Sequence, residues 1–285
     1  MSYKKTLIRL LDRPGGRFLL GKMATTFLRR ASGEQFELAY MNGLWTRRIG
    51  SYFLPDSPTF EYAYADFGTW NRQVDQYIAD TKEFWLQHYR PQEGDVVVDV
   101  GAGRGEDTLT FSRGVGASGR VLAIEAHPLS FEILRNFCRL NDLNNVTALQ
   151  LAAMDAPGTV HILESASSWM ENAIAKADLA LGVPVRAATL DEVCAAQGIK
   201  DIAYLKMNIE GSERYALLGM ESVLQRVEQI CVACHDFRAD WGHGEEFRTR
   251  AFVEQFLTTH GFILASRPDD KRQAIRDHIF GLRRV

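Results

Sequence analysis

The sequence predicts an α/β protein with a doubly wound, mostly parallel sheet. From Asp95 onward, short apolar strand patterns alternate with helical patterns, as in a parallel sheet covered on both faces. The first strand, Val96–Val98, leads into three glycines at alternate positions, Gly101, Gly103 and Gly105, and then into a helical pattern. Glycines at such a turn let a ligand approach the backbone, and the helix start presents free N–H groups. We therefore expect a nucleotide-type ligand at this turn.

Composition sets broad limits on the protein. With 285 residues, 46% of them hydrophobic and 24% charged, the chain can bury one substantial core and carry an extension. No apolar run reaches the length of about 18 residues that a membrane span needs, and the basic N-terminus does not resemble a signal peptide, so a cytoplasmic location is expected. The cysteines Cys138, Cys194, Cys231 and Cys234 lack a disulfide spacing and are expected to be reduced core thiols.

Charge is unevenly distributed along the chain. Residues 1–50 carry ten Lys and Arg against three Asp and Glu, whereas the remainder carries 23 against 33. A basic arm of this kind could contact anionic lipid at a membrane surface, a phosphorylated substrate or a second subunit in a homodimer, or it could pack on its own acidic domain. Nucleic acid is not an expected partner, because no basic patch interleaved with aromatic residues is present.

Residues 1–90 are predicted to form an extension that acts as a lid, a substrate-side layer or an oligomerisation element, ahead of a domain at 91–285. Its expected elements are helices at Leu7–Leu11 and Phe18–Leu28, extended segments in Phe36–Phe53 around the turn Asn42–Gly43, and a helix at Gln73–Tyr89. Lys22, Arg29 and Arg30 flank the apolar face of the second helix, for which we favour packing on protein over contact with a membrane. Between the extended segments and the last helix lie the aromatic residues Phe60, Tyr62, Tyr64, Phe67 and Trp70.

The elements of the domain follow in order. Strands are expected at Val96–Val100, Val121–Glu125, Val146–Leu151, Gly158–Leu163, Val183–Ala188, Ile202–Ile209, Gln229–Cys234, Phe262–Ser266 and His278–Arg283, with helices after Gly105 and at Pro128–Leu140, Asp191–Ala196, Glu213–Leu224 and Phe247–Thr259. The last two strands are expected to pair as a hairpin, which would make the sheet mixed. The segment Glu164–Leu181, rich in Ser and Ala, is interpreted as an active-site loop.

Three features narrow the choice of ligand. The glycine spacing is G-x-G-x-G and not the dinucleotide pattern G-x-G-x-x-G, and the acidic helix start Glu106–Asp107 suits a cationic ligand such as S-adenosylmethionine better than a phosphate. Glu125 ends the second strand 20 residues after Gly105, where a carboxylate can accept two ribose hydroxyls, although this would fit NAD as well. The small residues at Leu151–Met154 leave room for an adenine ring, with Asp155 either an acceptor for its amine or a plain loop residue.

A polar segment ends the fourth strand of the parallel set, at the edge of the sheet where open α/β folds bind ligands. Alternation along this strand places Lys206, Asn208 and Glu210 on one face, which indicates a polar site. We expect Lys206 to pair with Glu210 or Glu213.

These motifs together resemble the FkbM family of S-adenosylmethionine-dependent methyltransferases. The resemblance rests on VVVDVGAGRGEDT, VLAIEAHP, Asn141, TLDEV at Thr189–Val193, and LKMNIEGSE followed by Gly219, in that order and spacing. It implies a class I methyltransferase fold with seven strands, S-adenosylmethionine as cofactor, and methylation of hydroxyl groups on sugars, glycolipids or natural products. Glu213 is implied near the methyl-transfer face. The expected cofactor contacts are Asp99, Gly101, Ala102, Gly103, Glu106, Thr108, Glu125, Ala126, Ala153 and Asn208.

The same resemblance shows two departures, which bear on catalysis. The family commonly has aspartate where this chain has Asn208, and an E-x-H pattern where it has Ala233-Cys234-His235. An amide neither acts as a general base nor holds a divalent cation strongly, so no resident metal is expected.

The remaining catalytic candidates follow from these departures. The expected base is His235, because its ordinary pKa suits proton transfer, with Glu210 second and Asn208 beside them. Alternatively, His235 is a loop residue bonded to Asp236, or it joins Asp236, Asp240 and His243 in a metal site. Transfer to nitrogen or carbon, and a relative that binds the cofactor without turnover, remain alternative functions, while the glycine spacing disfavours a nicotinamide oxidoreductase.

Overall fold

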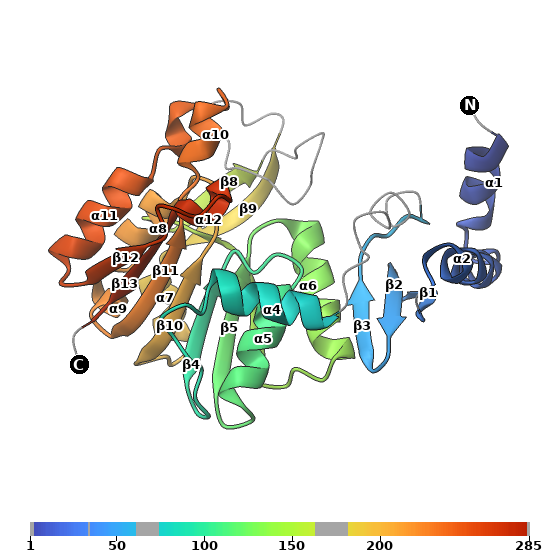
Figure 1. Cartoon of the computed structure of the whole chain (residues 1–285), viewed down its shortest axis with the longest axis horizontal. Coiled ribbons are helices and arrows are strands. Elements are labelled where there is room, and N and C mark those ends of the chain that lie inside the picture. Colours follow the sequence, from blue (N-terminus) through green and yellow to red (C-terminus); the bar gives the residue numbers. More distant parts are fainter. Residues whose placement is uncertain (1–2, 34, 61–73, 163–181, 284–285) are drawn as a thin grey trace. The chain divides into compact units, whose positions relative to one another are not determined.

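The computed structural model of the chain describes residues 3–33, 35–60, 74–162 and 182–283 (Figure 1). These residues form two compact units. The first contains the described residues up to Asp80 together with Glu132–Asn144, and the second contains those of Thr81–Phe131 and Asn145–Val285. The predicted aromatic segment at 61–73 and the Ser/Ala-rich loop Glu164–Leu181 lie outside the described residues.

The first unit places two helices beside a small antiparallel sheet. Its elements are α1 (Tyr3–Leu11), α2 (Arg17–Ser32), β1 (Glu37–Met41), β2 (Leu44–Ile49) and β3 (Tyr52–Pro55), with sheet order β1-β2-β3. Both predicted helices and the hairpin are confirmed, since Asn42 and Gly43 adopt the positive φ angles, 53° and 85°, that a tight two-residue hairpin turn needs. Asn141, one of the motif residues, accepts a hydrogen bond from the Phe53 N–H at 2.9 Å and donates to the Phe53 carbonyl at 2.7 Å.

The second unit contains a seven-stranded sheet with the order β12-β13-β11-β10-β4-β5-β6 (Figure 1). The strands are β4 (Val96–Val100), β5 (Arg120–Glu125), β6 (Val146–Gln150), β10 (Ile202–Met207), β11 (Val227–Ala233), β12 (Ile263–Ser266) and β13 (His278–Leu282). Neighbours from β11 to β6 run parallel, whereas β13 is antiparallel to both β11 and β12. The mixed sheet with a closing hairpin is therefore confirmed, and β10 is its central strand.

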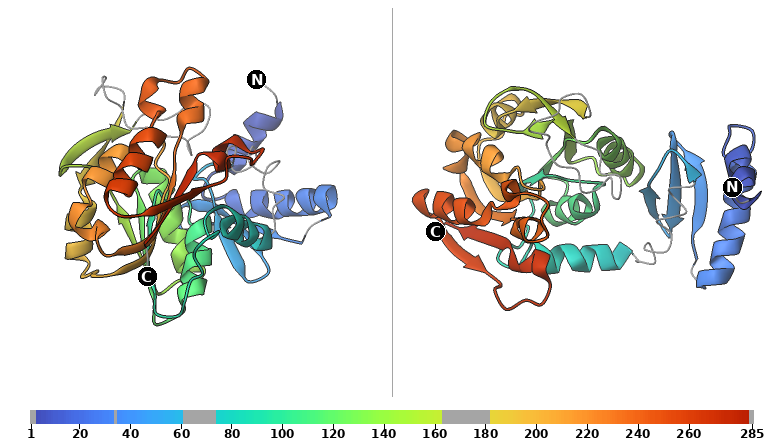
Figure 2. Two further views of the ribbon diagram at one scale, coloured as in Figure 1. Left: turned by 60° about the vertical axis from the view of Figure 1, so that its left-hand side comes forward. Right: turned by 90° about the horizontal axis from the view of Figure 1, so that it is seen from above.

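Helices cover both faces of this sheet (Figure 2). The helical elements of this unit are the end of α4 (Val74–Phe84), α5 (Glu106–Val115), the start of α6 (Pro128–Leu140), α7 (Leu190–Ala196), α8 (Glu213–Leu218), α9 (Glu221–Leu224), α10 (Asp236–Asp240), a 3-10 turn at Glu245–Phe247, α11 (Arg250–Thr259) and α12 (Gln273–Arg276). Successive strand residues point to opposite faces, so Leu205 packs in the core with α7, α8, α9 and α11, while Tyr204 packs in a second core with Phe111 of α5.

Three further strands form a second, separate sheet. These are β7 (Ala152–Ala153), β9 (Val183–Ala188) and β8 (Gly158–Ile162), in the order β7-β9-β8. The predicted edge strand that begins at Gly158 is confirmed as an edge, because β8 pairs only with β9 among the described residues. Ala152 and Ala153 follow directly from the end of β6 and pair with Ala187 and Ala188, so the short β7 joins the two sheets.

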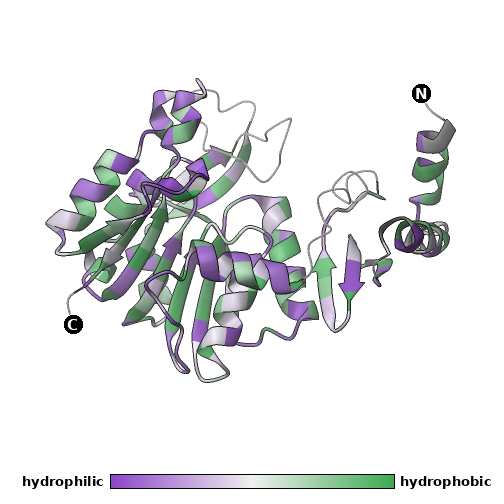
Figure 3. Cartoon of the chain, in the orientation of Figure 1, coloured by the Kyte–Doolittle hydropathy of each residue, from purple (hydrophilic) through white to green (hydrophobic). Residues whose placement is uncertain are grey.

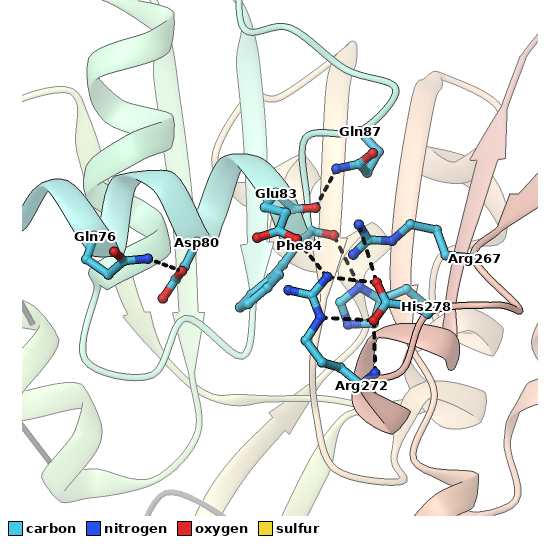
Figure 4. A network of polar contacts seen from close by, with 9 residues as sticks. Gln76, Asp80, Glu83, Phe84, Gln87, Arg267, Arg272 and His278 are labelled. Carbon is cyan, nitrogen blue, oxygen red and sulfur yellow. Dashed lines mark hydrogen bonds and ion pairs between the residues drawn. The ribbon is translucent and has the colours of Figure 1, made fainter.

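Tertiary contacts end helix α4 at Phe84, five residues earlier than predicted. The Trp85 carbonyl accepts a 2.5 Å hydrogen bond from the Tyr204 hydroxyl, and the Tyr89 ring stacks on Tyr204. The end of α4 is also tied to the C-terminal hairpin (Figure 4). Arg272 Nη2 donates to Glu83 Oε1 at 2.6 Å, and the Phe84 carbonyl lies 3.2 Å from His278 Nδ1.

The helix predicted at Glu213–Leu224 is broken into α8 and α9. A Cβ atom at Gly219 would overlap the Met154 carbonyl, so the chain passes close to another segment there. Asp191 stabilises the new start, because its carboxylate accepts hydrogen bonds from the N–H groups of Ser222 and Val223 at 3.0 and 2.7 Å.

Two further expectations concern the chain as a whole. All four cysteines are buried, as the prediction of core thiols requires. Among residues 3–33, 35–60, 74–162 and 182–283, no helix combines the length and apolar character needed to cross a bilayer.

Candidate functional site

The glycine turn after β4 brings three strand ends together. The N–H groups of Gly101 and Ala102 both donate to the Ile124 carbonyl of β5, at 2.9 and 3.0 Å, and the Asn208 N–H donates to the Val100 carbonyl at 2.9 Å. Gly101 has φ 76°, and a Cβ there would overlap the Asn208 carbonyl. Glycine is therefore required at this position both for its φ angle and for the close approach of β10.

A cavity of about 260 Å³ opens at this edge of the sheet. Its wall includes the predicted residues Gly101, Ala102, Gly103, Glu106, Glu125, Ala126, Ala153, Asn208 and Glu210. Arg104, His127, Ser130, Ile162, Ile209 and Ser212 also line it, and sequence reasoning missed them. Asp155 is exposed and is not among the lining residues.

Asp99 and Thr108 lie beneath the glycine turn and not on the cavity wall. Both are fully buried, and the Thr108 hydroxyl donates to Asp99 Oδ2 at 2.6 Å. The second Asp99 oxygen lies 2.9 Å from Lys206 Nζ, which also donates to the Gly101 carbonyl at 2.7 Å. These residues hold the shape of the turn, so Asp99 and Thr108 support the cavity wall from beneath, through Gly101 and Lys206, which both line it.

Lys206 does not pair with Glu210 or Glu213, so that prediction is wrong. It lies opposite Asp99 in the β4–β10 register and is also 3.7 Å from Asp107 Oδ2. Burial alone would lower the pKa of Lys206, but the Asp99 and Asp107 carboxylates raise it, so the ammonium group stays charged. Asp107 also accepts a 2.7 Å hydrogen bond from the Thr81 hydroxyl, and burial raises its pKa in spite of this bond and of Lys206.

Glu125 and Glu106 supply carboxylates to the cavity itself. Glu125 accepts hydrogen bonds from the N–H groups of Gly103 and His127, at 2.9 and 2.8 Å. Burial raises the pKa of Glu125 to about 7 and also raises the pKa of Glu106. A carboxylate whose ionised form is disfavoured by burial gains from a ligand that brings hydroxyl donors or positive charge.

Glu210 stands at the cavity wall and is held by two cationic groups. Its Oε1 lies 3.3 Å from His235 Nε2, and its Oε2 accepts a 2.6 Å hydrogen bond from Arg238 Nη1. Burial would raise the pKa of Glu210, but the hydrogen bonds from His235 and Arg238 lower it, so the carboxylate is ionised at neutral pH. Glu210 has φ 53°, a strained value for a residue other than glycine, of the kind that clusters at functional sites.

His235 does not have the properties expected of a general base. It is buried behind Glu210, is not among the cavity-lining residues, and its Nδ1 lies 2.9 Å from Glu213 Oε1. Burial would lower the pKa of His235, but the Glu213 and Glu210 carboxylates raise it to about 10. At neutral pH the imidazole is therefore protonated already and has no lone pair with which to accept another proton.

The structure does not support the two alternative roles of His235, a bond to Asp236 and a metal site shared with Asp236, Asp240 and His243, because Asp236 and Asp240 have other partners. Asp236 does not bond His235 but accepts hydrogen bonds from the Thr249 and Arg250 N–H groups, both at 3.0 Å, at the start of α11. Asp240 pairs with Arg248 at 2.8 Å. Among the described residues, no group of three or more His, Cys, Asp or Glu side chains is arranged to hold a metal ion.

Arg238 is the most important residue that the sequence pattern did not reveal. It lies in the short helix α10, which directly follows His235 and was not among the expected elements. The available signal was its spacing, because a basic residue three positions after His235 lies on the same side of a helical turn.

Residues 99–264 match the family model described as "Methyltransferase FkbM domain". The chain belongs to the FkbM methyltransferase family. FkbM membership and the seven-stranded sheet confirm the class I methyltransferase fold, and the matched residues form a methyltransferase domain whose cofactor is S-adenosylmethionine.

Comparison with solved structures returns other methyltransferases. The FkbM methyltransferase from Methylobacillus flagellatus KT is 17% identical, with a TM-score of 0.45 over 73% of this chain and 50% of that one. Fibrillarin from Aeropyrum pernix with bound S-adenosyl-L-methionine is 11% identical, with a TM-score of 0.45 over 87% and 98% of the two chains. An O-methyltransferase from Bacillus cereus in complex with SAH is 13% identical, with a TM-score of 0.43 over 78% and 86%. The chain thus spans half the length of the Methylobacillus FkbM structure, and no curated protein matches it.

The cavity residues fit the cofactor of the FkbM family. Gly103 has φ 57° and open space where a side chain would stand, so a ligand can reach the backbone there. Glu125 offers a buried carboxyl group to hydroxyl donors, Glu106 adds a second carboxyl group to the same wall, and Glu210 adds an ionised carboxylate. These carboxyl groups favour a ligand that carries positive charge, such as a sulfonium cation.

Proposed function

We propose that the protein transfers a methyl group to a hydroxyl of a sugar, a glycolipid or a natural product, and that Glu210 accepts the hydroxyl proton. The observation that supports this proposal is the ionised Glu210 carboxylate on the wall of the cofactor cavity, with protonated His235 behind it. Because His235 is already protonated, Glu210 is the group of this pair that can take up the proton lost by the hydroxyl that receives the methyl group.

S-adenosylmethionine supplies, when bound, a methyl group on a positively charged sulfur, which is an electrophile that needs no further activation. This methyl group would be supplied to the acceptor oxygen with the sulfur as leaving group, and Glu210 would take up the proton that the hydroxyl loses. Each Glu210 oxygen already accepts one contact, from His235 or Arg238, and retains a lone pair for the hydroxyl. The two cationic partners fix the direction of these lone pairs, which is the main task of a protein in this reaction.

Asn208 lies beside Glu210 on the cavity wall and has a different task. Its amide cannot take up a proton, but its NH₂ group can donate to the acceptor oxygen and its carbonyl can accept from a second hydroxyl. Vicinal hydroxyls, as in a sugar, would satisfy Glu210 and Asn208 at once. This pairing supports a polyhydroxylated acceptor over an isolated alcohol.

The test combines product chemistry with one substitution. The chain is incubated with methyl-labelled S-adenosylmethionine and fractionated host metabolites and glycolipids, and the labelled product is analysed for a methyl ether. Glu210→Gln is expected to reduce turnover about 10²- to 10⁴-fold while leaving cofactor affinity nearly unchanged. Glu221→Gln, an exposed glutamate on α9, is the matched control. Full activity of Glu210→Gln would remove Glu210 as the proton acceptor, and a methylated amine or carbon would replace O-methylation with the alternative reaction.

A further inference from the structure

Exposed large apolar side chains gather on the two N-terminal helices. Six of the nine such residues found exposed in the described part of the chain belong to α1 or α2, with exposed fractions from 50% to 79%. They are Leu7, Leu10, Phe18, Leu19, Met23 and Phe27. Exposed apolar groups scattered singly are normal, but a cluster on two consecutive helices marks an interaction surface.

Helix α2 has two apolar sides, and only one of them faces the core. Leu20, Ala24 and Leu28 are buried against the small sheet, as the amphipathic pattern predicts. Leu19, Met23 and Phe27 repeat at the same four-residue spacing one position earlier, so they form a second stripe that faces outward. Figure 3 shows this mixture of hydrophobic and hydrophilic residues along α2.

Basic residues border the outward stripe. Neither α1 nor α2 contains an Asp or Glu, whereas the two helices together carry seven Lys and Arg. Lys22 and Arg30 lie next to the stripe and are exposed. A groove between α2 and β1 is lined by Arg17, Lys22 and Arg29, with Glu37 as its one acidic residue.

We propose that the surface formed by α1 and the outward side of α2 docks on an anionic lipid bilayer. The outward stripe enters the boundary between headgroups and acyl chains, while the basic residues beside it contact lipid phosphates, the arrangement of an interfacial amphipathic helix. Charge complementarity selects this occupant over a second copy of the chain, because pairing two such surfaces would bring two sets of cations together without an acid in either helix to compensate them. This inference does not rest on the identity of the methyl acceptor.

The test is flotation of the full chain with lipid vesicles. We expect binding to vesicles of phosphatidylcholine with phosphatidylglycerol, little binding to phosphatidylcholine alone, and loss of binding near 1 M salt, where the Debye length is about 3 Å. The double variant Met23→Ser/Phe27→Ser is expected to weaken binding about tenfold or more. Lys22→Gln/Arg30→Gln is expected to weaken it about 30-fold, from the charge lost at an anionic surface.

Control variants distinguish a membrane-binding surface from a general loss of fold and from a dimer interface. Ile263→Thr removes exposed apolar area from β12, far from α2 in the sequence, and should leave vesicle binding unchanged. Each variant is checked for an unchanged circular dichroism spectrum and cofactor affinity, because all the substituted side chains are exposed. The proposal is overturned if wild type does not bind the anionic vesicles, or if it is a dimer that Met23→Ser/Phe27→Ser converts to monomer, which would assign the surface to self-association.

Discussion

Replacing His235 tests the charge state on which the proposed chemistry depends. His235 lies between Glu210 and Glu213, and the Glu213 side chain is fully buried. In His235→Gln the neutral amide leaves the buried Glu213 and the partly exposed Glu210 without their shared cation. Removal of one partner from a buried ion pair typically destabilises a protein by about 3–5 kcal/mol. The rise in the pKa of His235 from 6.5 to about 10 leads to a similar upper value of about 5 kcal/mol.

The pH dependence of this loss is the sharper part of the prediction. A histidine whose pKa is raised by folding contributes its full stabilisation below its unfolded pKa and loses it as the pH rises through its folded pKa. The window therefore runs from pH 6.5 to about 10. Within it, the difference in unfolding free energy between wild type and His235→Gln should narrow by about 1.4 kcal/mol per pH unit, or about 3 kcal/mol between pH 7 and pH 9.

Urea denaturation followed by tryptophan fluorescence at pH 7, 8 and 9, without cofactor, measures this difference. His278→Gln is the matched control, because burial lowers the pKa of His278 to about 4 and the ring is neutral throughout this range. Its difference from wild type should not change with pH. A difference for His235→Gln that is equally constant would show that His235 is neutral in the folded protein, and would return it as a candidate base.

Three further predictions concern the glycine turn and its support. Gly101→Ala should lower the free energy of unfolding by about 3 kcal/mol or more and should also lose cofactor binding. Gly103→Ala should lower the free energy of unfolding by only about 1 kcal/mol and should mainly block the cofactor. Denaturation and calorimetric titration with S-adenosylmethionine measure the two effects. Because folding raises the pKa of Glu125 to about 7, the free energy of unfolding of the cofactor-free wild type should fall as the pH rises from 4.5 to 7. Glu125→Gln should not show this fall. The same variant should bind the cofactor at least about tenfold more weakly than wild type. Lys206→Met should lower the free energy of unfolding by about 3–5 kcal/mol, because it leaves the buried Asp99 without its cation. Adding Asp99→Asn should recover part of the lost stability in a double-mutant cycle. If the effects of the two substitutions simply add, the two side chains are not energetically paired.

The sequence predicted those parts of the fold that local pattern determines. The β-branched run before Gly101 gave the first strand, and Pro128 with the apolar periodicity behind it gave α6 with its observed bounds. Features that depend on a distant segment were missed. The helix break at Gly219 is caused by the Met154 carbonyl, 65 positions earlier in the chain, and the early end of α4 depends on the Tyr204 hydroxyl.

The position of the site could be predicted from the sequence, but the pairing of its charged groups could not. The residues lining the cavity follow from motif position, since Gly101, Glu125 and Asn208 all lie at strand ends that meet. Pairing between charged groups could not be read in this way, because it depends on which strands are neighbours. Lys206 finds Asp99 because β10 lies directly beside β4, a relation that no local spacing contains.

The two buried charge clusters explain why both ends of the LKMNIEGSE motif carry ions. Lys206 pairs with Asp99 beneath the glycine turn, whereas Glu210, four residues later, pairs with His235, just after β11, and with Arg238 of α10. The first cluster fixes the backbone that meets the cofactor, and the second fixes the carboxylate that we propose meets the acceptor. Because both clusters are anchored on the central strand β10 and the turn that follows it, the separation between Lys206 beneath the glycine turn and Glu210 on the cavity wall is determined by one short stretch of backbone. The strained φ of Glu210 is then a consequence of the need to turn this carboxylate into the cavity within three residues of the end of β10.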